Sequence, residues 1–146
     1  GMITRTATIT PTASPIPPAT WTPGPATWAI SYKPSTDIHP EKACNWLGVG
    51  GQVLDAAGKP LQYQTLQLGG TLENAPVSHI NLSGTASDYG VAGYEFVLSD
   101  HPVASTQTLW IQLFDNTGQA LTDKVYFDTY ADCTRNLVMI DFTKKK

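Results

Sequence analysis

The sequence predicts an all-β domain, built as a sandwich of two sheets, behind an extended segment rich in proline and threonine. Between residues 44 and 143, apolar and polar residues alternate with a period of two, as half-buried strands require. No run of helical length in that part repeats with a period of 3.6 residues. Eight of the eleven prolines, by contrast, fall within residues 1–40. The chain therefore divides into a linker (residues 1–40) and one sandwich domain (residues 41–146).

The alternating runs identify the expected core. One face of each run carries its apolar side chains: Tyr94, Phe96 and Leu98; Leu109, Ile111 and Leu113; Val125 and Phe127; Val138, Ile140 and Phe142; with Val49, Val53, Leu66 and Leu68. These runs amount to about seven strands in roughly 100 residues, the size and spacing of an antiparallel immunoglobulin-like or prealbumin-like sandwich.

The first 40 residues have a different composition. They hold nine threonines and no acidic residue before Asp37. Proline lacks a backbone donor, so residues 10–18 are expected to form extended polyproline II, as stalks of this composition do.

The end of this linker is more apolar than a spacer requires. Trp21, Trp28, Ile30 and Tyr32 are costly to leave in water. Residues 26–32 are therefore expected to add a strand to the domain or pack on it. The alternative is that they dock onto a neighbouring molecule or mask a binding face.

The expected domain contains two cysteines. Cys44 precedes the first strand-like run and Cys133 precedes the last. First and last strands commonly lie close together in such a sandwich, so we expect a Cys44–Cys133 disulfide, which would stabilise the fold by roughly 4 to 5 kcal/mol. Free thiols are the alternative. Zinc is not expected, because neither cysteine has a CxxC partner or a nearby pair of histidines.

One local pattern occurs twice. Asp55 and Gly58 follow one strand-like run, and Asp115 and Gly118 follow another in the same Asp-x-x-Gly arrangement. The aspartate opens a turn by accepting backbone hydrogen bonds and the glycine closes it with a positive φ, so we interpret these four as turn residues rather than calcium ligands.

Residues 44–142 resemble the carboxypeptidase-regulatory-like, transthyretin-like sandwich modules of bacterial surface proteins. The resemblance is carried by residues 51–61 (GQVLDAAGKPL) and 93–96 (GYEF), and the closest similarity is to uncharacterised modules that follow Pro/Thr-rich linkers, in residues 44–53, 89–95 and 129–137. It implies a folded, non-catalytic structural or binding module. The segment from Ser99 to Thr108 is longer than the family pattern, and no functional residue carries over.

Composition excludes several other functions. The net charge is −3, and the Lys144–Lys146 run at the end of the chain is the only cluster of basic residues, so a nucleic-acid binder is excluded. No run of apolar residues approaches the length that is needed to span a membrane. An export signal is also absent, but Gly1 ahead of Met2 looks like the remnant of a tag, so this absence is uninformative. We expect an extracellular or cell-surface location.

The sequence shows no catalytic pattern. His39, His79 and His101 lie in separate segments and are expected to be solvated loop residues, without metal or cofactor. Glu95 is expected on the outward face of its strand as a surface charge. Asp128 and Asp132 could form a small cation site with Asp55 or Asp115 only if their loops converge. We therefore expect that the domain is not an enzyme.

One aromatic feature remains. If Leu109 and Ile111 point inward, the outward side chains of two strands form what we call the aromatic face: Trp110, Gln112, Phe114 and Tyr126. Such a face could be covered by the Trp28–Tyr32 segment, contact a protein or a second copy, or stack on a carbohydrate. The leading hypothesis is thus a structural and interaction module, and the alternative is a carbohydrate-binding module.

Overall fold

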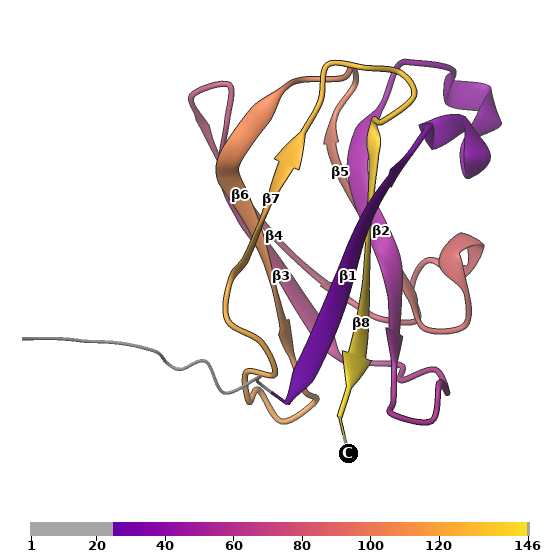
Figure 1. Cartoon of the computed structure of the whole chain (residues 1–146), viewed down its shortest axis with the longest axis vertical. Coiled ribbons are helices and arrows are strands. Elements are labelled where there is room, and N and C mark those ends of the chain that lie inside the picture. Colours follow the sequence, from indigo (N-terminus) through magenta and orange to yellow (C-terminus); the bar gives the residue numbers. More distant parts are fainter. Residues whose placement is uncertain (1–24, 146) are drawn as a thin grey trace, which may run out of the picture.

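The computed structural model describes residues 25–145, which form a two-layer β-sandwich (Figure 1). These residues form eight strands: β1 (Ala26–Lys33), β2 (Leu47–Leu54), β3 (Thr65–Leu72), β4 (Ala75–Leu82), β5 (Gly93–Ser99), β6 (Ser105–Phe114), β7 (Val125–Thr129) and β8 (Leu137–Lys144). Three short 3-10 helices lie between strands: η1 (Ser35–Asp37), η2 (Pro40–Lys42) and η3 (Ser87–Tyr89). One sheet has the order β1-β8-β2-β5 and the other β4-β3-β6-β7. The predicted all-β, two-sheet class is confirmed.

The core lies between the two sheets and contains the predicted alternating residues. Tyr94, Ile111 and Ile140 are fully buried, each on a different strand, and Leu98 packs against the same cluster with partial exposure. The Tyr94 hydroxyl donates a 2.6 Å hydrogen bond to the carbonyl of Ile140, so this buried phenol has a partner inside the core.

One pairing departs from the predicted antiparallel arrangement. β2 and β8 run parallel, with Val49 opposite Val138 and Val53 opposite Phe142. The prediction was wrong for this pair because a period of two reveals which face a residue occupies and not the direction of the neighbouring strand. The neighbours β1 and β5 pair antiparallel with β8 and β2.

The end of the expected linker forms part of the sandwich. β1 pairs along its whole length with β8, from Ala26 opposite Lys144 to Lys33 opposite Leu137. Residues 26–32 thus add a strand, the first of the two packing arrangements expected for them. The other linker predictions, including polyproline II at residues 10–18 and the role of Trp21, lie outside the described residues, as does Lys146.

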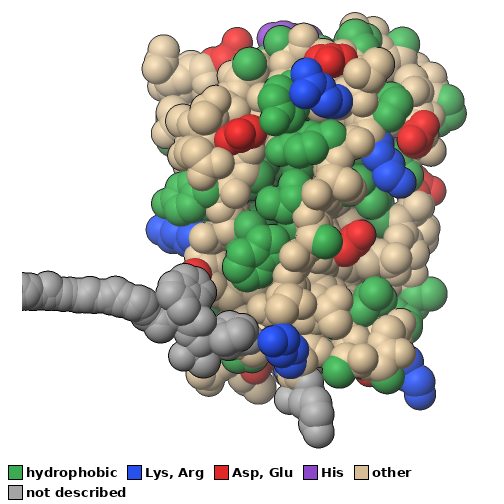
Figure 2. All heavy atoms as spheres, in the orientation of Figure 1, with side chains coloured by type: hydrophobic (Ala, Val, Ile, Leu, Met, Phe, Trp, Pro, Cys, Tyr) green, Lys and Arg blue, Asp and Glu red, His purple; other side chains and the backbone are tan. Residues whose placement is uncertain are grey.

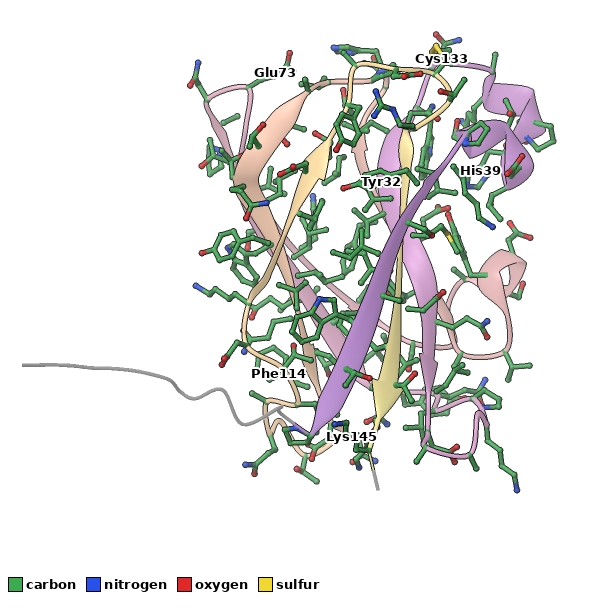
Figure 3. The ribbon with its side chains drawn as sticks, in the orientation of Figure 1. Tyr32, His39, Glu73, Phe114, Cys133 and Lys145 are labelled. Atoms are coloured by element: carbon green, nitrogen blue, oxygen red, sulfur yellow. A yellow bond between two sulfur atoms is a disulfide. The ribbon has the colours of Figure 1, made fainter. Side chains whose placement is uncertain are left out.

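The two ends of the described chain meet at one end of the sandwich, which we call the base. There the Lys145 amide donates a 2.7 Å hydrogen bond to the carbonyl of Pro25. At the opposite, far end, Cys44 and Cys133 form the predicted disulfide, with their Cα atoms 5.3 Å apart. Figure 3 shows Cys133 and Lys145 at opposite ends of the molecule.

A buried amide lies near the disulfide and joins three segments. The side-chain oxygen of Asn136 accepts a 2.7 Å hydrogen bond from the Ser35 amide. Its nitrogen donates to the Ser35 hydroxyl (2.7 Å) and to the Trp46 carbonyl (2.9 Å). Asn136 and Ser35 are completely buried, so these bonds replace contacts with water. The starts of β2 and β8 are thereby held to the chain that leaves β1.

We expect Asn136→Ala to lower the free energy of unfolding by about 2 to 4 kcal/mol, because it leaves the Ser35 amide and the Trp46 carbonyl buried without partners. Urea denaturation followed by tryptophan fluorescence measures the change. Asn116→Ala, in an exposed turn, is the matched control and should change stability by less than about 0.5 kcal/mol. Equal effects of the two substitutions would contradict this role for Asn136.

Candidate functional site

The two Asp-x-x-Gly segments form closely similar turns. Asp55 Oδ1 accepts hydrogen bonds from the amides of Ala57 (2.8 Å) and Lys59 (2.9 Å). Asp115 Oδ1 accepts the equivalent pair from Thr117 and Gln119, both at 2.9 Å, and a further one from the Thr117 hydroxyl. These bonds, first of all the one from the Thr117 side chain, lower the pKa of Asp115. Gly58 and Gly118 close the turns with φ of +82° and +89°.

The carboxylates that could have formed a cation site have local partners instead. Asp128 Oδ1 accepts hydrogen bonds from the amide and the side chain of Gln107. Asp132 accepts from both the amide and the hydroxyl of Thr134, and it also pairs with Arg135 at 3.1 Å. Within residues 25–145, no group of three or more histidine, cysteine or acidic side chains is placed to hold a metal ion.

The predicted aromatic face lies on the outer side of the sheet that contains β6 and β7. Trp110 is directly opposite Tyr126 on β7 and opposite Gly69 on β3. Its ring lies over Gly69, where a Cβ would collide with the indole. Phe114 is partly exposed at the end of β6, near the base (Figure 3).

Two of the four side chains on this face already have partners. The Lys124 ammonium lies over the Trp110 ring, 4.5 Å from the ring centroid, in a cation–π contact. Gln112 donates its side-chain N–H to the Thr122 carbonyl at 2.8 Å. Tyr126 is 46% exposed. The ammonium thus occupies the ring face on which a sugar would stack.

The cover expected from the Trp28–Tyr32 segment is not there. β1 belongs to the other sheet, at the edge beside β8, so its side chains do not lie across Trp110. That expectation was wrong because the apolar character of the segment suits a strand at the sandwich edge equally well. Lys124 covers the ring instead.

A polar cluster that the sequence did not predict lies on the outer side of the first sheet. Glu95 Oε2 accepts a hydrogen bond from the Tyr89 hydroxyl (2.8 Å) and lies 2.5 Å from His39 Nε2. His39 also lies against the buried ring of Trp46, with the two ring centroids 5.2 Å apart. Burial, with the bond to Glu95 second, raises the pKa of Tyr89 far above its usual value.

This cluster corrects two expectations. His39 and Glu95 are not solvated surface groups, because their side chains are only 18% and 21% exposed. His79 was also expected in a loop, but it lies on strand β4 and stacks on Phe96. His101 is an exposed loop residue, as expected, and lies beside Asp100. The sequence could not predict the contact between His39 and Glu95, because the two residues are 56 positions apart in the chain. The cluster holds the η1–η2 segment to the sheet.

A second feature is an apolar strip between the edge strands β1 and β7, which we call the open flank. The sequence indicated that its residues are too apolar for a linker, but not that they lie at a sheet edge. Figure 2 shows hydrophobic side chains in a line down the middle of this face. Trp28 is 46% exposed and Ile30 37% exposed. Near the far end, Tyr32 packs edge-on against Tyr130, whose ring is covered by the Arg135 guanidinium at 4.0 Å.

The open flank is tied at both ends and open between them. At the base, the Ala26 amide donates to the Leu121 carbonyl at 3.1 Å. Near the far end, the Tyr32 hydroxyl donates to the Asp128 carbonyl at 2.9 Å. The opposite flank is bridged by the Asn81 side chain of β4, which donates a hydrogen bond to the Glu95 carbonyl of β5. Trp28 and Ile30 lie between these two ties, and both side chains are exposed among the described residues.

Comparisons with known proteins identify no family. No family model matches the chain, and no curated protein matches it. One solved structure that is similar is the dioxygenase domain of a dioxygenase carbohydrate-binding protein fusion from the cellulolytic bacterium Streptomyces sp. SirexAA-E. The identity is 15% and the TM-score 0.40, over 68% of this chain and 78% of that one. A similarity this weak says nothing about what this chain binds or catalyses. No helix within residues 25–145 is long and apolar enough to cross a membrane.

If Lys124 covers the indole of Trp110, Lys124→Ala will make that ring more accessible to the neutral quencher acrylamide. We expect a clear rise in the quenching constant, measured in a Trp21→Phe, Trp28→Phe background so that Trp110 and the buried Trp46 are the remaining fluorophores. Lys59→Ala, in the exposed turn after β2, is the control. Unchanged quenching in the Lys124 variant would show that the ring is not covered in solution.

Proposed function

We propose that this chain is a non-catalytic, extracellular interaction module that is tethered at one end, in a bacterial surface or secreted protein. The observation that carries the proposal is the bond between Lys145 and Pro25 at the base. Residues 25 and 145 lie side by side at the base, so segments joined to the domain at these two residues would start from the same end. A domain connected in this way adds little length between its neighbours, so it suits presentation of a surface better than spacing.

The disulfide and the buried amide support this proposal. Disulfides persist in oxidising compartments, which fits a secreted or surface location. The Cys44–Cys133 bond and the Asn136 hydrogen bonds together fix the far end of the sandwich, opposite the tether. The resemblance of residues 44–142 to carboxypeptidase-regulatory-like modules supports the same kind of function, and we include membership of that family in the proposal.

The structure offers less support for the alternative of carbohydrate binding through the aromatic face. Stacking on a sugar requires an open ring face, and the Trp110 ring has Gly69 beneath it and the Lys124 ammonium over it. The amide of Gln112, which could have oriented a hydroxyl, already donates to Thr122. The open flank is the better candidate surface for an interaction, because exposed apolar side chains there have no described cover.

Pulling the chain from its two ends tests the tethered arrangement. Force applied at residues 25 and 145 acts on β1 and β8 at their shared end, so their hydrogen bonds should open one after another at low force. With the disulfide intact, extension should stop after roughly 30 residues, about 100 Å, because residues 44–133 stay closed.

Reduction of the disulfide is the control for this measurement. The Cys44–Cys133 loop spans 89 residues and should add about 300 Å of extension once it is open. A single abrupt event at high force, as in strands loaded in shear, would indicate a load-bearing spacer and contradict the proposal.

A further inference from the structure

The edge of β1 has backbone groups that no described residue pairs. The hydrogen bond from Lys145 to Pro25 shows that residue 25 faces β8 with its polar groups. Antiparallel ladders alternate, so residues 27, 29, 31 and 33 also face β8, and the even residues face away from it. The Ala26 amide confirms this alternation, because it points away from β8 and reaches the Leu121 carbonyl. Trp28, Ile30 and Tyr32 thus direct their N–H and C=O groups outward along the free edge.

The other three edge strands each carry a feature that discourages pairing. β4 contains Pro76, which cannot donate to a neighbour. The Glu95 carbonyl on β5 is bonded by the Asn81 side chain. β7 is short, with five residues. β1 has eight residues and no proline, bulge or charge before Lys33. Natural sheets seldom leave such an edge open unless it has a partner.

The exposed side chains belong to the same residues. Trp28, Ile30 and Tyr32 lie on the core-facing side of β1, opposite Phe142, Ile140 and Val138 of β8. A strand added to the edge would therefore satisfy the outward backbone groups and cover Trp28 and Ile30 at once. The occupant that fits must be extended and apolar on one face.

We propose that this occupant is β1 of a second copy, paired antiparallel about a two-fold axis at Ile30. In this register Trp28 lies opposite Tyr32 of the second copy and Ile30 lies opposite itself. Trp28, Ile30 and Tyr32, whose polar backbone groups face outward, then all belong to hydrogen-bonded pairs. Charge is compatible too, since the edge carries none from Ala26 to Tyr32 and Lys33 lies opposite Thr27 of the second copy.

The antiparallel pairing determines where the connecting chains of the two copies lie. The connecting chains leave each copy at the start of β1, and antiparallel strands put those starts at opposite ends of the pair. Two paired copies would thus have their tethers pointing apart, as in a contact between molecules on facing surfaces. The inference rests on the proposed function and names its partner as a second copy of this chain.

Analytical ultracentrifugation of the full chain up to about 1 mM tests the pairing. The interface is small, so we expect a dimer with a Kd on the order of 0.1 mM. Ile30→Lys places two ammonium groups opposite each other at the axis and should weaken the dimer at least tenfold. Ile80→Lys, also an isoleucine on an edge strand and 67% exposed, should leave it unchanged.

A cysteine at the axis tests the register without depending on charge. Directly opposed residues in a hydrogen-bonded pair have Cα atoms about 5.5 Å apart, within the range that a disulfide spans. Ile30→Cys should therefore form a covalent dimer under mild oxidation. Ala29→Cys should not form a covalent dimer. Its side chain points to the other face of the sheet, and residue 29 lies opposite residue 31 of the second copy, not opposite residue 29.

Three results would overturn the inference: a monomer at every concentration, a dimer that is indifferent to Ile30→Lys, or equal cross-linking at positions 29 and 30. A monomer whose Trp28 fluorescence responds saturably to a polysaccharide would do so too, by assigning the open flank to a carbohydrate. None of these results affects the tethered arrangement, which fails only if the pulling experiment shows a load-bearing spacer. The two proposals can therefore be separated.

Discussion

The side-chain amide of Asn136 is the constraint on which the far end of this sandwich depends. Three segments that are distant in the sequence meet at this one residue: the chain after β1, the chain before β2 and the start of β8. The Gly48 amide adds a backbone bond to the Asn136 carbonyl. A buried amide with several polar partners admits few alternative arrangements, since each misplaced neighbour would leave a buried polar group unpaired.

The disulfide reinforces the same region from outside the core. Cys44 and Cys133 precede β2 and β8, the two strands whose starts Asn136 aligns in parallel. Parallel neighbours cannot be joined by a tight turn, so their register must be set by other contacts. In this chain a covalent bond and a buried hydrogen-bond network set it together. The glycines of β2 complete the arrangement, because Gly48 and Gly50 leave room for the rings of Trp46 and Tyr89 on the outer face.

Much of the fold could be predicted from local patterns. Alternation along β6 correctly placed Leu109 and Ile111 inside and Trp110 outside, because a strand has only two faces. The disulfide was predictable for a related reason, since its cysteines precede the first and last runs of the expected core. The parallel β2–β8 pair was not predictable, because the pattern of a strand is the same whichever way its neighbour runs.

The functional surfaces were harder to predict because they depend on contacts between distant residues. Trp110 was correctly placed on an outer face, but the Lys124 ammonium over its ring comes from a separate segment. His39 and Glu95 meet only after the η1–η2 segment folds back over the sheet. Trp28 and Ile30 were noted as too apolar for a linker. Their place on a free edge, with outward backbone groups, required the pairing of β1 with β8.

Amide hydrogen exchange measured by NMR tests most directly whether the edge of β1, which no described residue pairs, is filled by a second copy. In dilute solution the amides of Thr27, Ala29 and Ser31 should be protected by β8, whereas those of Trp28, Ile30 and Tyr32 should exchange quickly. Raising the concentration toward 1 mM, above the expected Kd, should slow exchange at these even positions alone. Exchange at Ile30 that is equally slow at every concentration would contradict the account, because the edge would then be occupied within a single chain.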